Sequence, residues 1–139
     1  MTIAPRLAAI AAAVLVLGIG TTALAQDQTS ATGSDKIKAV LLRPAGWTAD
    51  WIGLSGSSGT AEFVYEARGQ QVVVRIQQLF RSDGATLPKC ERDVKINSDG
   101  MTHDGCMDYG IAFLFDARDQ DFPFRGKSPR GYEYKLKAK

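Results

Sequence analysis

Apolar and polar residues alternate with a period of two through most of the chain. Trp47, Ala49 and Trp51 fall on one face of an extended segment, and Thr48 and Asp50 fall on the other. This alternation is typical of strands that bury one face and expose the other. The sequence therefore predicts a protein built mainly from β-strands.

The first hairpin is placed by its turn residues. Gly69-Gln70 suits a two-residue type II′ turn, because glycine tolerates the positive φ of the first turn position. Folding the chain there places Phe63 opposite Ile76 and Tyr65 opposite Val74, so apolar residues meet on one face. Polar and charged residues fall mainly on the other face, and this agreement supports the predicted register.

A second hairpin is indicated by Asp99-Gly100, a residue pair that favours a type I′ turn. This turn places Ile96 opposite His103 and directs both side chains inward. His103 is the single histidine of the chain. Because burial disfavours the charged imidazolium, we expect the pKa of His103 to be lowered.

Three further strands are predicted over 111–115, 122–125 and 132–138. Residues 35–42 fit either a short helix or a first strand, and Pro44 with its neighbouring glycine ends the element in both cases. The predicted fold class is all-β. It consists of a single antiparallel meander of about eight short strands, closed into a small barrel or a curled sheet.

The N-terminus has the organisation of an export signal. An uncharged run over 7–25 ends in Ala23-Leu24-Ala25, the small-x-small pattern that a signal peptidase cleaves. We expect residues 1–25 to be removed, residues 26–34 to form a flexible lead-in, and residues 35–139 to form a single barrel domain. An uncleaved anchor is the alternative, because the run is long enough to span a membrane. The expected location is periplasmic or secreted, with no stable membrane span after cleavage.

The two cysteines fit this location. Cys90 and Cys106 are expected to form a disulfide, which persists in oxidising compartments and stabilises a loop of this size by about 3 kcal/mol. The predicted register does not place them opposite each other, so an irregular segment is expected before Asp93 or at Gly105. With only one histidine available, they do not form a structural zinc site, and no metal or cofactor is predicted.

The segment from Trp47 to Ala138 resembles the small lipocalin-like and avidin-like barrels in size, export signal and strand order. The Gly-x-Trp signature of the first lipocalin strand is not present, because Trp47 follows Gly46 directly. The resemblance implies ligand binding by the barrel, and it carries over no individual binding residue.

The inward positions are rich in aromatic residues, which either fill the core or line a small cavity. The candidate ligand-binding residues are Trp47, Trp51, Tyr65, His103, Tyr132 and Tyr134. No catalytic residue is predicted, since no nucleophile, base and orienting group can be assembled around His103. With 17 basic and 15 acidic side chains, nucleic acid is not an expected partner.

The predicted function is therefore an exported, non-catalytic binding module rather than an enzyme. Its partner is expected to be a small apolar ligand or a protein of the cell envelope. The alternative is a structural or inhibitor-type interaction domain that uses the outer surface and the 53–59 loop.

Overall fold

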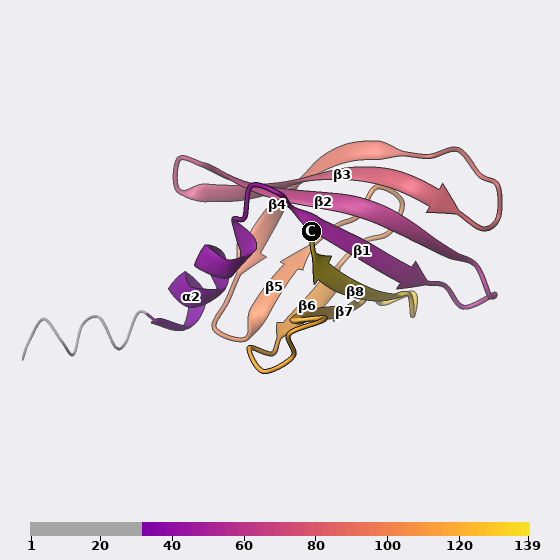
Figure 1. Cartoon of the computed structure of the whole chain (residues 1–139). Helices are drawn as coiled ribbons and strands as arrows, with labels where there is room; N and C mark the ends of the chain where they lie inside the picture. The colour runs from indigo at the N-terminus through magenta and orange to yellow at the C-terminus, as the bar shows by residue number, and fades with distance from the viewer. Residues whose placement is uncertain (1–31) are drawn as a thin grey trace, which may run out of the picture. The chain divides into compact units, whose positions relative to one another are not determined.

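The computed structural model describes residues 32–139 and confirms the all-β meander (Figure 1). Eight antiparallel strands follow one another around a closed barrel, and β8 pairs with β1 to close it. The predicted signal peptide, residues 1–25, and residues 26–31 of the predicted lead-in lie outside the described residues. The strands are β1 (Trp47–Ile52), β2 (Ser58–Arg68), β3 (Gln71–Arg81), β4 (Lys89–Ile96), β5 (Gly100–His103), β6 (Ile111–Phe115), β7 (Phe124–Lys127) and β8 (Glu133–Ala138).

The sequence fitted either a helix or a strand over residues 35–42. The structure shows that most of these residues belong to helix α2 (Thr32–Leu41). Asp35 in its first turn and Lys38 in its last turn both interact favourably with the helix dipole. Ile37 and Leu41, one turn apart, are buried in the core cluster. The helix also includes residues 32–34, so regular structure begins before the predicted boundary at residue 35.

The two ends of the barrel differ. Helix α2 packs at the end where β1 begins (Figure 1). The indole Nε1 of Trp47 donates to the carbonyl oxygen of Leu41 at 3.1 Å. We call this the closed end. The opposite end, where β1, β3, β5 and β7 terminate, we call the open end, and its loops are residues 53–57, 82–88, 104–110 and 128–132.

The barrel interior is packed with the inward-facing side chains of alternate strand positions. Large rings fill most of this volume, as expected for short strands that enclose little space. The buried cluster consists of Ile37, Leu41, Trp47, Ala49, Trp51, Ala61, Phe63, Tyr65, Val72, Val74, Ile76, Met101, Ile111, Phe113, Phe124, Tyr134 and Leu136.

The predicted register of the first hairpin is confirmed. Phe63 lies opposite Ile76, and Tyr65 lies opposite Val74. Gly69 has a φ of +63°, as the first position of a type II′ turn requires. Turn chemistry and the apolar face therefore specify the same pairing.

The predicted two-residue turn at Asp99-Gly100 is wrong. Ile96 lies opposite Met101 rather than opposite His103, so the turn is wider. A type I′ turn needs positive φ at both central residues, which neither residue has. Instead, Oδ1 of Asn97 accepts the N–H groups of both residues at 2.8 Å. The register is displaced by two positions, which keeps each side chain on its predicted face, and His103 is buried.

Strand β7 begins at Phe124, two residues later than predicted, because the preceding segment is held as a loop. Pro123 has no N–H to donate, and its carbonyl accepts the N–H of Asp116 at 2.8 Å. The N–H of Phe122 is bonded to Oδ1 of Asp119 at 2.9 Å. Strand β8 begins at residue 133 rather than 132.

The pairing between β4 and β5 is short, since only Lys95 and Ile96 of β4 pair with β5. A disulfide joins Cys90 of β4 to Cys106 of the 104–110 loop, with Cα atoms 5.6 Å apart. This confirms the predicted disulfide. The irregular segment that the predicted register required is the 104–110 loop, which follows β5. Nε of Arg92 adds a hydrogen bond to the carbonyl of Gly105 at 3.1 Å.

Candidate functional site

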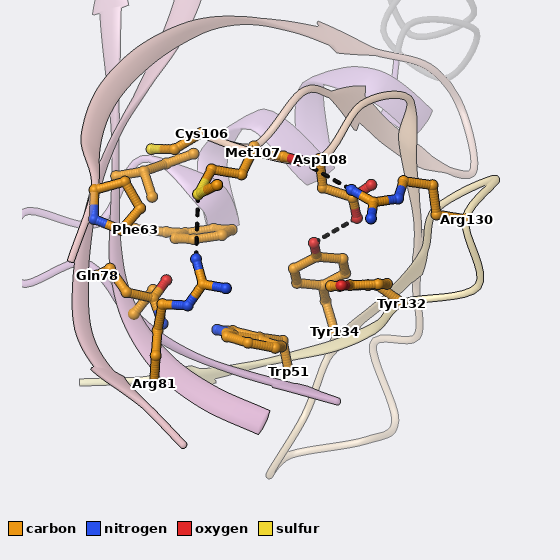
Figure 2. Close-up of a pocket in the computed structure, with 14 residues that line it drawn as sticks. Trp51, Phe63, Gln78, Arg81, Cys106, Met107, Asp108, Arg130, Tyr132 and Tyr134 are labelled. Atoms are coloured by element: carbon orange, nitrogen blue, oxygen red, sulfur yellow. Dashed lines mark hydrogen bonds between the residues drawn. The ribbon is translucent and has the colours of Figure 1, made fainter. Parts of the chain in front are cut away.

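A pocket of about 150 Å³ lies at the open end of the barrel (Figure 2). Its floor is formed by Ala61, Phe63 and Ile76, which are buried side chains of β2 and β3. Met107 and Arg130, which also line it, are exposed loop residues. The pocket therefore leads from the solvent-facing loops to the apolar core.

Two parallel aromatic rings form one wall of the pocket. The ring centroids of Trp51 and Tyr132 are 5.9 Å apart, and their planes differ by 15°. Gly59 lies behind the indole, since a Cβ at this position would come within 2.5 Å of two Trp51 ring carbons. The loop predicted over residues 53–59 is therefore shorter than expected, because β2 begins at Ser58. Gly59, its predicted last residue, belongs to β2 and lies against the aromatic wall.

A second wall contains a buried tyrosine–carboxylate pair. The hydroxyl of Tyr134 donates to Oδ2 of Asp108 at 2.6 Å, and Oδ1 of the same carboxylate accepts the N–H of Tyr109 at 3.0 Å. Burial, followed by the hydrogen bond to Asp108, raises the pKa of Tyr134 well above its ordinary value. Tyr134 therefore stays protonated and acts as a fixed hydrogen-bond donor.

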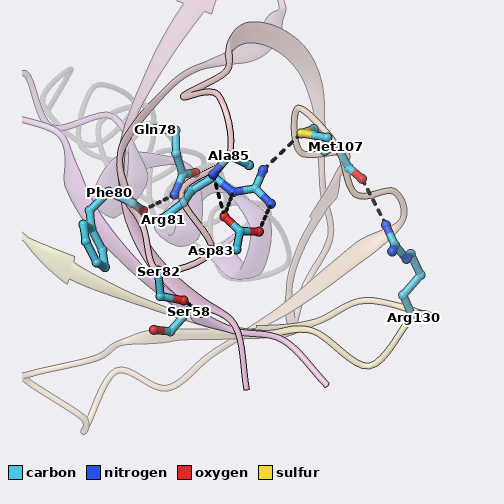
Figure 3. Close-up of polar contacts among 9 residues, drawn as sticks. All are labelled: Ser58, Gln78, Phe80, Arg81, Ser82, Asp83, Ala85, Met107 and Arg130. Carbon is cyan, nitrogen blue, oxygen red and sulfur yellow. Dashed lines mark hydrogen bonds and ion pairs between the residues drawn. The ribbon is translucent and has the colours of Figure 1, made fainter. Parts of the chain in front are cut away.

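The rim is formed by two arginines and one methionine (Figures 2 and 3). Arg81 is held by Asp83, with its NH2 group 2.8 Å from Oδ2, and this hydrogen bond is the main cause that lowers the pKa of Asp83. NH1 of Arg81 donates to the Met107 sulfur at 3.1 Å. NH1 of Arg130 donates to the Met107 carbonyl oxygen at 3.3 Å. Met107 thus connects the two guanidinium groups across the mouth of the pocket.

Both guanidinium groups also lie over the aromatic wall. The guanidinium carbon of Arg81 is 5.6 Å from the centroid of the Trp51 ring, and that of Arg130 is 5.1 Å from the centroid of the Tyr132 ring. Such cation–π contacts contribute about 0.5–1 kcal/mol each at exposed sites. The rim therefore carries two guanidinium groups above the apolar floor of the pocket.

The structure brings together three of the six predicted ligand-binding residues. Trp51, Tyr132 and Tyr134 line the pocket. Trp47, at the closed end, and Tyr65 and His103, in the core, do not line it. These three are buried: Trp47 and Tyr65 belong to the core cluster, and His103 stacks on Phe113.

His103 and Tyr65 form a hydrogen-bonded pair inside the core. Nδ1 of His103 is 2.8 Å from the carbonyl oxygen of Asp104, so this nitrogen carries the proton. Nε2 therefore accepts the hydroxyl proton of Tyr65 at 2.8 Å. Burial is the dominant cause that lowers the pKa of His103 to about 4, and the Asp104 carbonyl and charge oppose it. The predicted direction of this shift agrees with the structure.

The rim arginines and Met107 were missed by the sequence analysis. Arg81 ends a strand and Arg130 lies in a turn, and neither belongs to a motif that predicts binding. Their proximity depends on three loops that are distant in the sequence. A weak signal exists in the surplus of basic residues near the C-terminus, but it does not distinguish Arg130 from its neighbours.

The acidic side chains at the pocket are paired within the protein. Among residues 32–139, no group of three or more His, Cys, Asp or Glu side chains is arranged to hold a metal ion. Asp108 and Asp83, the carboxylates at the pocket and its rim, are already bonded to Tyr134 and Arg81. Each of these carboxylates therefore already accepts hydrogen bonds from protein groups.

Comparison of the chain with protein-family models, with curated proteins and with solved structures finds no match. The eight-strand meander agrees with the barrel layout of the lipocalin-like proteins. No helix between residues 32 and 139 combines the length and the apolar character that crossing a membrane requires.

Proposed function

We propose that the protein is an exported, non-catalytic binding module that holds a small, largely apolar group in the pocket at the open end. The observation that carries this proposal is the combination of a buried apolar floor, a parallel aromatic wall and exposed rim residues in one pocket. The disulfide between Cys90 and Cys106 supports an oxidising location such as the periplasm or the medium.

The pocket volume limits what can enter. Pockets for drug-sized ligands occupy about 300–1,000 Å³, whereas this pocket measures about 150 Å³. An apolar cavity of about 150 Å³ holds one benzene molecule. The proposed ligand is therefore a single ring or a group of that size, in contrast to the long apolar ligands that a wider barrel accommodates.

The two tryptophans provide a built-in comparison for a direct test. Trp51 lines the pocket, whereas Trp47 is bonded to Leu41 at the closed end. We expect benzyl alcohol, added to ¹⁵N-labelled protein, to move the indole N–H resonance of Trp51 in a saturable way and to leave that of Trp47 in place. The variant Trp51→Phe assigns the two signals. Equal or non-saturable changes in both signals would show that the pocket does not bind the probe.

A protein partner is a second candidate, and the distribution of exposed apolar side chains favours it. Among residues 32–139, all but one of the exposed large apolar residues lie in the open-end loops or within three residues of them. The exception is Leu114 in β6. Those at the open end are Ile52, Leu54, Leu79, Phe80, Leu87, Met107 and Tyr109.

Apolar residues gathered at one end of a molecule are typical of protein-contact surfaces. A partner protein could place an aromatic side chain in the pocket and cover these residues at the same time. This candidate predicts that Leu54→Ser, in the 53–57 loop, weakens capture of a partner from the exported fraction without changing the response of Trp51 to benzyl alcohol.

A further inference from the structure

The rim contains a strong hydrogen-bond donor that is paired with a weak acceptor. NH1 of Arg81 donates to the thioether sulfur of Met107, whereas the other donors of this guanidinium bind the Asp83 carboxylate (Figure 3). A thioether is a weak acceptor, and a carboxylate bonded to a guanidinium is one of the strongest pairings available. An anionic oxygen at the position of the sulfur would therefore be preferred.

Arg81 is fixed in position before any ligand arrives. Its side chain is only 14% exposed. Both oxygens of Asp83 accept from it, and Oδ1 of Asp83 also accepts the N–H of Ala85 at 3.0 Å. A donor that is already oriented loses little conformational entropy when a ligand binds.

Met107 is the residue of the rim whose side chain a ligand can displace. It is 57% exposed, and its unbranched side chain changes conformation readily. Its carbonyl accepts from Arg130, so the sulfur site lies between two guanidinium groups. Arg130 forms no ion pair with any residue between 32 and 139, and its positive charge remains available at the mouth.

The geometry points to a single-ring aromatic carboxylate as the ligand of this pocket, with its ring beside Trp51 and its carboxylate at Arg81 and Arg130 in place of the Met107 sulfur. This inference rests on the proposed function, because the ring occupies the same pocket. The only carboxylate lining the pocket, Asp108, is bonded to Tyr134 and Tyr109. Guanidinium donors at the rim and an apolar floor complement a ligand with an anionic head and an apolar body.

The test compares three probes of matched structure by the Trp51 indole signal and by calorimetry. Benzoate carries ring and charge, benzamide carries the ring without the charge, and acetate carries the charge without the ring. We expect benzoate to bind at least about tenfold more tightly than benzamide, as a charge-assisted hydrogen bond provides. Acetate should produce no saturable change in the Trp51 signal.

Variants locate the charge recognition. Arg130→Gln, at an exposed position, should reduce the preference for benzoate over benzamide to less than about threefold. Met107→Leu keeps an apolar side chain but removes the sulfur acceptor, and it should retain the preference. The control Arg118→Gln alters a 93% exposed arginine in the loop between β6 and β7, at the closed end, and should leave the preference unchanged.

The outcomes separate this inference from the proposed function. Equal affinities for benzoate and benzamide would overturn the inference and leave the proposed function standing. A preference that survives Arg130→Gln would also overturn it, because the inference assigns the carboxylate to both guanidinium groups. Acetate binding as tightly as benzoate would overturn it as well, because the ring would then contribute nothing to affinity. If neither benzoate nor benzamide nor benzyl alcohol moves the Trp51 signal, both the inference and the proposed function are wrong.

Discussion

At the scale of single residues, His103 is surrounded by aromatic rings. It stacks on Phe113 with centroids 5.1 Å apart, and the rings of Phe63 and Tyr65 approach it edge-on. A charged imidazolium would lose its hydration in this environment, which is the physical cause of its lowered pKa. The folded protein therefore holds His103 neutral, whereas the unfolded chain protonates it near its ordinary pKa.

This difference makes the stability of the protein depend on pH. Between the unfolded pKa of 6.5 and the folded pKa of about 4, only the unfolded state binds the proton. Stability is therefore unaffected by His103 above pH 6.5 and falls as the pH decreases towards 4, by on the order of 3 kcal/mol in total.

We expect the double variant Tyr65→Phe/His103→Phe to show a flatter loss of stability in this window. Replacing both residues avoids leaving the Tyr65 hydroxyl buried without a partner. Urea unfolding followed by circular dichroism, at intervals between pH 7 and pH 4, measures the two slopes. The single variant Tyr65→Phe is the control: it keeps the buried imidazole and should therefore retain a pH-dependent loss of stability that the double variant lacks. Identical slopes in the wild type and the double variant would show that His103 does not cause the effect.

At the scale of elements, the 104–110 loop links the stability of the barrel to its pocket. This loop follows the short strand β5 and carries Met107 of the rim and Asp108 of the wall. Because β4 pairs with β5 at only two residues, the disulfide and the Arg92 hydrogen bond supply the other connections between β4 and this segment.

Removing the disulfide should therefore lower the stability of the barrel and loosen the 104–110 loop at the pocket. We expect Cys90→Ala/Cys106→Ala to lower the free energy of unfolding by about 3 kcal/mol, on the loop-entropy model. Amide hydrogen exchange of residues 104–110 should accelerate more than that of the β2–β3 hairpin. Wild-type protein unfolded with and without a reductant separates the lost cross-link from lost side-chain packing. A change of less than about 1 kcal/mol, with unaltered exchange, would contradict this account.

At the scale of the whole molecule, the barrel depends on the pairing of its first and last strands. All six residues of β1 pair with β8, from Trp47 with Ala138 to Ile52 with Glu133. Leu136 of β8 is fully buried beside Ala49 and Phe124. Without β8, the edges of β1 and β7 would be left unpaired and the core would be open to water.

Deleting residues 133–139 should therefore abolish cooperative folding rather than weaken it by a small amount. Near-ultraviolet circular dichroism during thermal unfolding measures this, because the aromatic core loses its fixed environment. The variant Lys135→Ala/Lys137→Ala, which changes exposed side chains of β8 and keeps its backbone pairing, should unfold cooperatively. A sharp transition in the shortened chain would show that closure is not required.

Much of the architecture could be predicted from the sequence because strand formation depends on local patterns. The two-residue alternation identified which face of each strand is buried, and the Gly69-Gln70 turn specified the first register. The face of His103 was also predicted correctly, since a displacement of two residues preserves the face even when the turn is assigned incorrectly. The pairing of the two cysteines followed from the expected export of the chain and needed no knowledge of the fold.

The tertiary structure alone decided the features that depend on distant segments meeting. Gly100 is an example: its position predicted a type I′ turn, but its φ is not positive, and glycine is required there because a Cβ would lie 1.8 Å from the carbonyl oxygen of Phe113 in β6. The pocket rim is another, because Arg81, Met107 and Arg130 come from three separate loops or strand ends. Alternation along a strand specifies the face of a residue but not its height in the barrel. For this reason the sequence grouped Trp47 with Trp51, and only closure of the barrel placed Trp47 at the closed end and Trp51 at the open end.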